Sequence, residues 1–237
     1  MRRKLFLGGA LTLAVFGITA GSAMALTPVQ TIDGELGGKA TPKFDKKKFK
    51  KTSVEVTTTT SDADNPSGMP PKATKAEIKF DKKDMKFDTK AAKACDPNAI
   101  ENTTTDAALS ACGSAKVGSG SATAALPFGA GGTRQDFPAT VTAFNRSDAK
   151  GVLLHSRVDQ LGTTVVLKGT LSGTNLSVDI PPLGGGVGAI SEFNTKIKKG
   201  KYVQGRCKAK TIKYSGTFTF SDAPAASDTD TQKCKRK

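Results

Sequence analysis

The chain has 237 residues and a formal net charge of +15, from 36 lysines and arginines against 21 aspartates and glutamates. It contains no tryptophan and a single histidine, so every histidine-dependent mechanism must use His155. No cofactor motif or metal-ligand spacing stands out in the sequence, and we expect neither a cofactor nor a metal ion.

Residues 1–25 have the three-part layout of an export signal. Residues 2–4 are basic, residues 5–20 are apolar, and residues 23–25 are Ala-Met-Ala, a small-x-small end. The alternative is a retained membrane anchor, which the glycines and threonines within the apolar run disfavour. We therefore expect a protein that is secreted or associated with the cell envelope, without a transmembrane span once the signal is cleaved.

The next segment, residues 26–42, is expected to be an extended lead-in to a single β-sandwich domain at residues 43–237. This domain begins with residues 43–51, KFDKKKFKK, which place six lysines beside one aspartate. The pentapeptide KFDKK returns at residues 79–83, but the flanking residues do not repeat. We expect a coincidence rather than a solenoid period.

Period-two alternation of β-branched residues predicts the strands. In residues 52–60, Val54, Val56 and Thr58 share one face, which is typical of a strand. A loop rich in Asp, Asn, Pro and Gly follows at residues 61–74. Further strands are expected at residues 76–81, 117–128, 139–144, 152–158, 163–169, 176–180, 190–197, 202–208 and 212–220.

One helix is expected, at residues 105–112. Thr104 or Thr105 can cap its start, and Gly113 follows its end. The chain is expected to finish with a polar tail at residues 222–237. Short strands separated by turns predict an all-β fold, an antiparallel β-sandwich or open barrel, with one short helix and two intrachain disulfides.

Four cysteines in an exported chain predict two disulfides. The sequence alone allows three connectivities, and we favour Cys95–Cys112 with Cys207–Cys234 because each pair brackets one local unit. The alternative is a metal site with four thiolate ligands. The cysteines lack the close spacing that zinc sites favour.

The single histidine has no recognisable catalytic context. Alternation in residues 152–158 puts His155 and Leu153 on the face that we expect to be the wetter one. Ser147 and Ser156 lie close in sequence, but neither belongs to a G-x-S-x-G nucleophile elbow. We expect a surface histidine on a strand and no catalytic residue.

Two acidic segments partly resemble calcium loops. Asp62, Asp64 and Asn65 lie where such a loop would open, and Asp228 and Asp230 form a similar fragment. Neither segment supplies the closing ligands of an EF-hand. We expect no metal site at either place.

Basic clusters are the strongest functional indication. They lie at residues 43–51, 196–210 and 233–237, and the last two come together if Cys207 bridges Cys234. The residues that we assign to an anion-binding surface are Lys196, Lys198, Lys199, Lys201, Arg206, Lys208, Lys210, Lys235 and Arg236.

Positive fields of this size attract anionic polymers such as teichoic acids, phospholipid headgroups or nucleic acid. Proteins that bind nucleic acids interleave stacking aromatics with such charge, and the only tyrosines are Tyr202 and Tyr214. We expect anionic cell-envelope polymers as partners and no specific nucleic acid. The alternative is that the lysines only keep a β-rich surface soluble and protect sheet edges.

Several cysteine- and glycine-containing motifs carry a family resemblance. Residues 112–120 (CGSAKVGSG), 205–207 (GRC), 218–222 (FTFSD) and 232–235 (QKCK) resemble motifs of uncharacterised secreted proteins from high-GC Gram-positive bacteria. The similarity covers the chain from about residue 43 onward. It implies a shared exported, disulfide-bearing β scaffold and no activity for any residue.

The sequence thus predicts a non-enzymatic, envelope-associated binding or structural module with a basic surface for anionic polymers. The alternative function is an exported hydrolase with a dispersed active site near His155.

Overall fold

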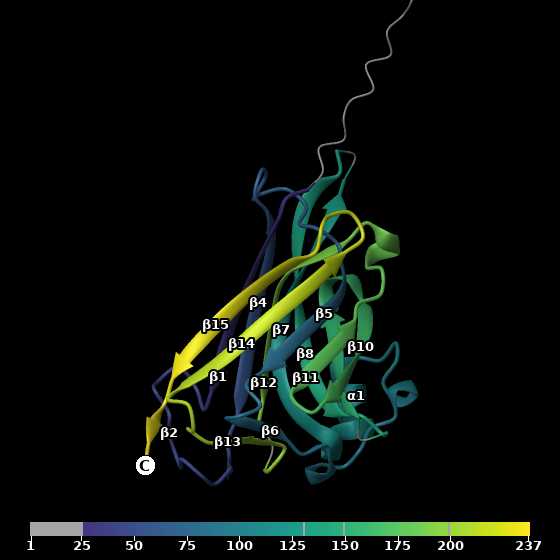
Figure 1. Ribbon diagram of the computed structural model, residues 1–237. Coiled ribbons are helices and arrows are strands. Elements are labelled where there is room, and N and C mark those ends of the chain that lie inside the picture. The colour runs from purple at the N-terminus through teal and green to yellow at the C-terminus, as the bar shows by residue number, and fades with distance from the viewer. Residues whose placement is uncertain (1–25, 130, 149, 199) are drawn as a thin grey trace, which may run out of the picture.

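The computed structural model describes residues 26–237 except 130, 149 and 199, and within these residues most of the chain is β-structure (Figure 1). The strands of the main sheet are β1 (Pro28–Leu36), β4 (Val54–Asp62), β5 (Ala73–Phe80), β7 (Lys116–Phe128), β8 (Thr133–Asn145), β9 (Gly151–Val158), β10 (Thr163–Ser172), β11 (Asn175–Asp179), β12 (Ala189–Ile197), β14 (Thr211–Phe220) and β15 (Ala226–Lys233). These eleven strands pair in the order β1-β4-β12-β7-β8-β9-β10-β11-β5-β14-β15, always antiparallel. The prediction of an antiparallel all-β fold is confirmed.

The sheet folds back on itself, so that β5, β11 and β14 face β4, β12 and β7 across the core (Figure 1). The predicted alternation of β4 is confirmed, because Val54, Val56 and Thr58 all face this interior. Gly120 on β7 allows a close strand approach, since a Cβ atom there would lie 1.9 Å from the carbonyl oxygen of Asn194.

The two edges of the sheet are joined by side chains rather than by a backbone ladder. Three side chains of β15 accept hydrogen bonds from backbone N–H groups of β1, and we call this row of contacts the seam. The acceptors are Asp228, Asp230 and Gln232. The N–H of Ile32 lies 2.8 Å from Asp228 Oδ2, that of Gly34 lies 2.9 Å from Asp230 Oδ2, and that of Leu36 lies 2.7 Å from Gln232 Oε1. This seam nearly closes the sheet and provides acceptors for backbone N–H groups along the edge of β1.

Segments near both ends of the described chain are strands of the main sheet. The predicted lead-in contains β1, which pairs with β4 over its whole length. The polar tail predicted at residues 222–237 is wrong for its central part, which is the edge strand β15. The sequence did not reveal this strand because the residues of β15 that face β1 are hydrogen-bond acceptors in the seam and not apolar core residues.

Two small sheets cover one end of the main sheet, drawn at the bottom of Figure 1. Their strands are β2 (Lys43–Phe44), β3 (Lys50–Lys51), β6 (Met85–Phe87), β13 (Val203–Gly205) and β16 (Lys235–Arg236). They pair in the order β3-β13-β6 and β16-β2. Beneath them Leu36, Met85 and Tyr202 are fully buried, so this end of the core is filled with side chains.

The helix α1 (Thr105–Cys112) has the predicted bounds, and its start is capped by Thr104, whose Oγ1 accepts a hydrogen bond from the N–H of Ala107 at 3.2 Å. Short 3₁₀ turns are η1 (Thr89–Ala91), η2 (Pro97–Ala99), η3 (Gly113–Ala115), η4 (Asp159–Leu161) and η5 (Gly184–Gly186). The favoured disulfides, Cys95–Cys112 and Cys207–Cys234, are both present.

The segment around α1 covers the outer face of β8 and β9 with a second, smaller core. Its buried residues are Cys95, Ile100, Ala108, Cys112, Ala115, Phe144 and Leu153. The segment is fixed by the Cys95–Cys112 bridge and by Asn145, whose Nδ2 lies within 3.1 Å of the carbonyl oxygens of Thr89, Ala92 and Lys93.

Two disulfides indicate folding in an oxidising compartment. Among the described residues, no helix has the length and apolarity needed to cross a membrane. The predicted signal at residues 1–25 lies outside the described residues.

Candidate functional site

Basic segments that are far apart in the sequence meet at the end covered by the two small sheets. We call this region the basic end. β2 pairs with β16 and β3 pairs with β13, which bring residues 43–51 beside residues 203–210 and 233–237. The exposed cations of the basic end are Lys43, Lys46, Lys47, Lys48, Lys50, Lys51, Lys82, Lys83, Lys86, Lys201, Lys208, Lys210, Lys233, Lys235, Arg236 and Lys237.

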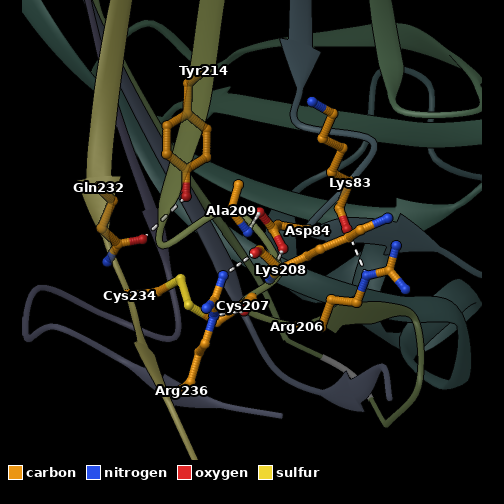
Figure 2. Close-up of a disulfide and its surroundings, with 10 residues drawn as sticks. All are labelled: Lys83, Asp84, Arg206, Cys207, Lys208, Ala209, Tyr214, Gln232, Cys234 and Arg236. Carbon is orange, nitrogen blue, oxygen red and sulfur yellow. Dashed lines mark hydrogen bonds between the residues drawn. A yellow bond between two sulfur atoms is a disulfide. The ribbon is translucent and has the colours of Figure 1, made fainter. Parts of the chain in front are cut away.

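The Cys207–Cys234 disulfide holds two of these segments together (Figure 2). Arg236 reinforces the link, because its Nη2 donates to the carbonyl oxygen of Lys208 at 2.6 Å and its Nε to that of Cys207 at 3.3 Å. The backbone N–H of Cys234 also donates to the carbonyl oxygen of Lys210 at 2.8 Å. The C-terminal lysines are therefore fixed beside residues 207–210.

Arg206 joins the two copies of the KFDKK pentapeptide. Its Nε donates to the carbonyl oxygen of Lys83 at 2.6 Å, and its Nη1 donates to that of Lys47 at 3.2 Å. Lys47 and Lys83 are the fifth residues of the two copies. The guanidinium also lies 4.3 Å from the centre of the Phe49 ring, a cation–π contact. Both copies thus place the carbonyl oxygen of their fifth residue on the side chain of one arginine.

The aspartates of the basic end are directed at backbone N–H groups instead of lysine side chains. Asp45 Oδ1 accepts from the N–H groups of Lys47 and Lys48 at 2.7 and 2.8 Å, and these bonds, that of Lys48 foremost, hold the pKa of Asp45 below its usual range. Asp84 is fully buried and accepts from the N–H groups of Lys208 and Ala209. These carboxylates shape the loops and form no ion pair with the exposed lysines within the described part of the chain.

The opposite end of the sheet has the reverse arrangement. Its cations each have a carboxylate partner, in the pairs Lys72–Asp222, Lys75–Glu77, Arg134–Asp136 and Arg157–Asp159. Over the described residues the charge is therefore polarised, with these paired cations at one end and lysines without a carboxylate partner at the other.

The residues assigned from the sequence do not all lie free at the basic end. Lys196 lies on the outer face of β12, where its Nζ is 2.8 Å from Glu55 Oε2, and this bond raises the pKa of Lys196. The guanidinium groups of Arg206 and Arg236 donate hydrogen bonds to backbone carbonyl oxygens. Lys199 lies outside the described residues. Lys196 is exposed but paired with Glu55, and the other exposed side chains of the assigned set are Lys198, Lys201, Lys208, Lys210, Lys235 and Arg236.

Sequence reasoning missed Lys82, Lys83 and Lys86 as members of the basic end. They lie between β5 and β6 or on β6 itself, and β6 pairs with β13. The repeated pentapeptide was the one pattern in the sequence that related residues 79–83 to residues 43–47.

His155 is buried rather than exposed, so the expectation of a wet strand face is wrong here. Its exposed fraction is 0%, because residues 100–104 and α1 cover that face of β9. His155 Nε2 lies 3.1 Å from the carbonyl oxygen of Thr103, which can only accept, while the Thr103 hydroxyl donates to the carbonyl oxygen of Ile100 at 2.8 Å. These contacts assign the Nε2 proton, and Nδ1 is buried and unpaired among the described residues. Burial favours the neutral form of this ring.

This arrangement does not favour a hydrolytic site. Ser156 follows His155 on the same strand and therefore points to the opposite face of the sheet. Ser147 is an exposed residue of the turn between β8 and β9. Neither hydroxyl makes a hydrogen bond with His155 in the described residues.

The buried histidine predicts a pH dependence of stability. Desolvation lowers the pKa of His155 in the folded state, so the unfolded chain binds a proton first as the pH falls. The contribution of the neutral ring is therefore present above about pH 6.5, the unfolded pKa, and is lost as the pH falls from there toward the lower folded pKa. Urea unfolding between pH 5 and 8 should show a smaller decrease for His155→Gln than for the wild type. An equal decrease would contradict the assignment of a neutral ring.

The acidic segments considered as calcium loops have structural roles. Asp62 Oδ1 accepts from the N–H of Thr27 at 2.9 Å, and Asp64 Oδ2 accepts from the hydroxyl of Thr27 at 2.8 Å. Asp228 and Asp230 belong to the seam. The described residues contain no group of three or more His, Cys, Asp or Glu side chains that could hold a metal ion.

Both tyrosines are buried, Tyr202 under the basic end and Tyr214 on β14, so neither is available for stacking with a base. No protein-family model matches this sequence, and no curated protein is significantly similar to it.

Proposed function

We propose that this protein is a non-enzymatic, extracytoplasmic binding module that holds anionic polymers of the cell envelope at its basic end. The observation that carries the proposal is the convergence of four lysine-rich segments on one end of the sheet, with their aspartates turned to the backbone. The predicted export signal, the resemblance to secreted proteins and the two disulfides support a place outside the cytosol.

The chemistry of the basic end fits a repetitive polyanion. Lysine ammonium groups are point charges on flexible stems, so they attract phosphates or carboxylates without requiring one fixed geometry. The two arginines that could make fixed bidentate contacts are already bonded to backbone carbonyls. Without an exposed aromatic platform from Tyr202 or Tyr214, such a surface favours charged polymer backbones over bases.

The proposal is tested by measuring binding to poly(glycerol phosphate) teichoic acid. Lys48→Gln with Lys235→Gln removes two exposed charges of the basic end, and each lysine near an anionic surface contributes about 1 kcal/mol. Affinity should therefore fall by about thirtyfold. The slope of log affinity against log salt should fall by about 0.7 for each lost contact.

The matched control is Lys72→Gln with Lys75→Gln, which removes the same net charge from the opposite end. Its affinity should stay close to that of the wild type. Equal losses for both double variants, or retention that does not respond to salt, would show that no defined basic end binds the polymer.

A further inference from the structure

The interior of the folded sheet contains a cavity of about 110 Å³ between its two facing halves. Its walls come from β4, β5, β9, β10, β11, β12 and β14, and they are made almost entirely of aliphatic and aromatic side chains. The polar residues of the wall are Thr58, Thr60, Glu192 and Thr195. Apolar cavities of this kind stay dry and accept apolar molecules.

The residues that line the cavity extend along the inward face of β4. Val54, Val56, Thr58 and Thr60, four successive inward positions of β4, all line the cavity. Six residue steps of about 3.3 Å give a length of roughly 20 Å. The volume of about 110 Å³ is the space open to the centre of a water-sized molecule. Spread over this length, it leaves a passage that is wide enough for a linear chain and too narrow for a compact ring system.

Small and loosely packed side chains create the space. Ala76 on β5 leaves room on one wall, and Val56, Leu176 and Phe193 point inward yet remain half-buried. Inward side chains of a filled core are fully buried, as Val117 and Val141 are in the same molecule. A water-sized molecule can therefore touch the cavity wall at these positions.

One wall residue offers an unused hydrogen-bonding group. Thr195 is only 8% exposed, lines the cavity, and its Oγ1 has no partner among the described residues. A buried hydroxyl without a partner is costly, so a polar atom of a bound molecule would stabilise it. Glu192 lines the cavity toward the end opposite the basic end and places a negative charge there, which disfavours an anionic ligand.

We propose that this cavity binds the linear aliphatic chain of an uncharged lipid, a long-chain alcohol or ester, whose oxygen hydrogen-bonds to Thr195. The site is separate from the basic end and does not depend on polymer binding.

The probe is 1-dodecanol, with affinity measured by titration calorimetry on the purified chain. The wild type should bind it, Ala76→Phe should abolish binding by filling the cavity, and Thr195→Val should weaken binding about tenfold through the lost hydrogen bond. Ala63→Phe is the matched control, because Ala63 is exposed outside the cavity, and its affinity should equal that of the wild type. Dodecanoate should bind more weakly than dodecanol.

A measurement on the wild type keeps the test independent of variant folding. The methyl groups of Val56 and Leu176 should give intermolecular NOEs to the dodecanol chain. Absence of binding, binding to Ala76→Phe at wild-type affinity, or dodecanol NOEs confined to exposed residues would overturn the proposal. Dodecanoate binding as tight as dodecanol would overturn the assignment of an uncharged lipid.

Discussion

Replacing Asp228 and Asp230 together by alanine is expected to lower the free energy of unfolding by about 1–3 kcal/mol for each residue. The double variant leaves the N–H groups of Ile32 and Gly34 without their acceptors, and no backbone ladder between β15 and β1 can replace them. Urea unfolding measures the loss, and amide exchange should accelerate first at Ile32 and Gly34.

The matched control for the seam is Asp228→Asn with Asp230→Asn. Asparagine keeps a carbonyl oxygen that accepts the same bonds, so this variant should lose less stability than the alanine variant. If alanine and asparagine cost the same, or if neither changes amide exchange in β1, the side-chain seam does not hold the sheet closed.

Removal of the Cys207–Cys234 bridge by Cys207→Ser with Cys234→Ser is expected to cost about 3–4 kcal/mol of stability. It should also weaken teichoic acid binding, because the bridge fixes the C-terminal lysines beside residues 207–210. Thermal unfolding and polymer titration measure the two effects on the same samples.

The other disulfide provides the control. Cys95→Ser with Cys112→Ser should cost about 3 kcal/mol, since its loop is of similar length, but it lies against α1 and away from the basic end. Polymer affinity should then be unchanged in folded protein. Equal loss of affinity in both serine variants would mean that binding responds to general stability and not to the geometry of the basic end.

The fold was largely predictable because most strands carry alternating β-branched or apolar residues. β4 and β14 are examples, with inward Val54 and Phe218 and outward polar neighbours. The disulfides could be predicted because the two cysteines of each pair lie on either side of one local unit, as Cys95 and Cys112 do. α1 followed from its cap, Thr104, and the alanines after it.

Features that depend on tertiary contacts could not be read from local patterns. β15 looked like a polar tail because Asp228 and Asp230 face another strand's N–H groups, so its period of two appears in carboxylates and not in apolar residues. His155 looked exposed because alternation cannot show that a distant helix covers the outer face of β9.

The candidate site was only partly predictable. The charge runs identified its lysines, and the cysteines related residues 207–210 to residues 233–237. The pairing of β2 with β16, which adds residues 43–51, depends on the packed fold. The role of Arg206 between the two KFDKK turns also appeared only in three dimensions.

The most direct test of the basic end is an NMR titration of the isotope-labelled protein with poly(glycerol phosphate). The account predicts amide shift changes confined to residues 43–51, 82–86, 201–210 and 233–237, with reversal on addition of salt. Shift changes centred on the outer face of β8 and β9, or none at low salt, would contradict it.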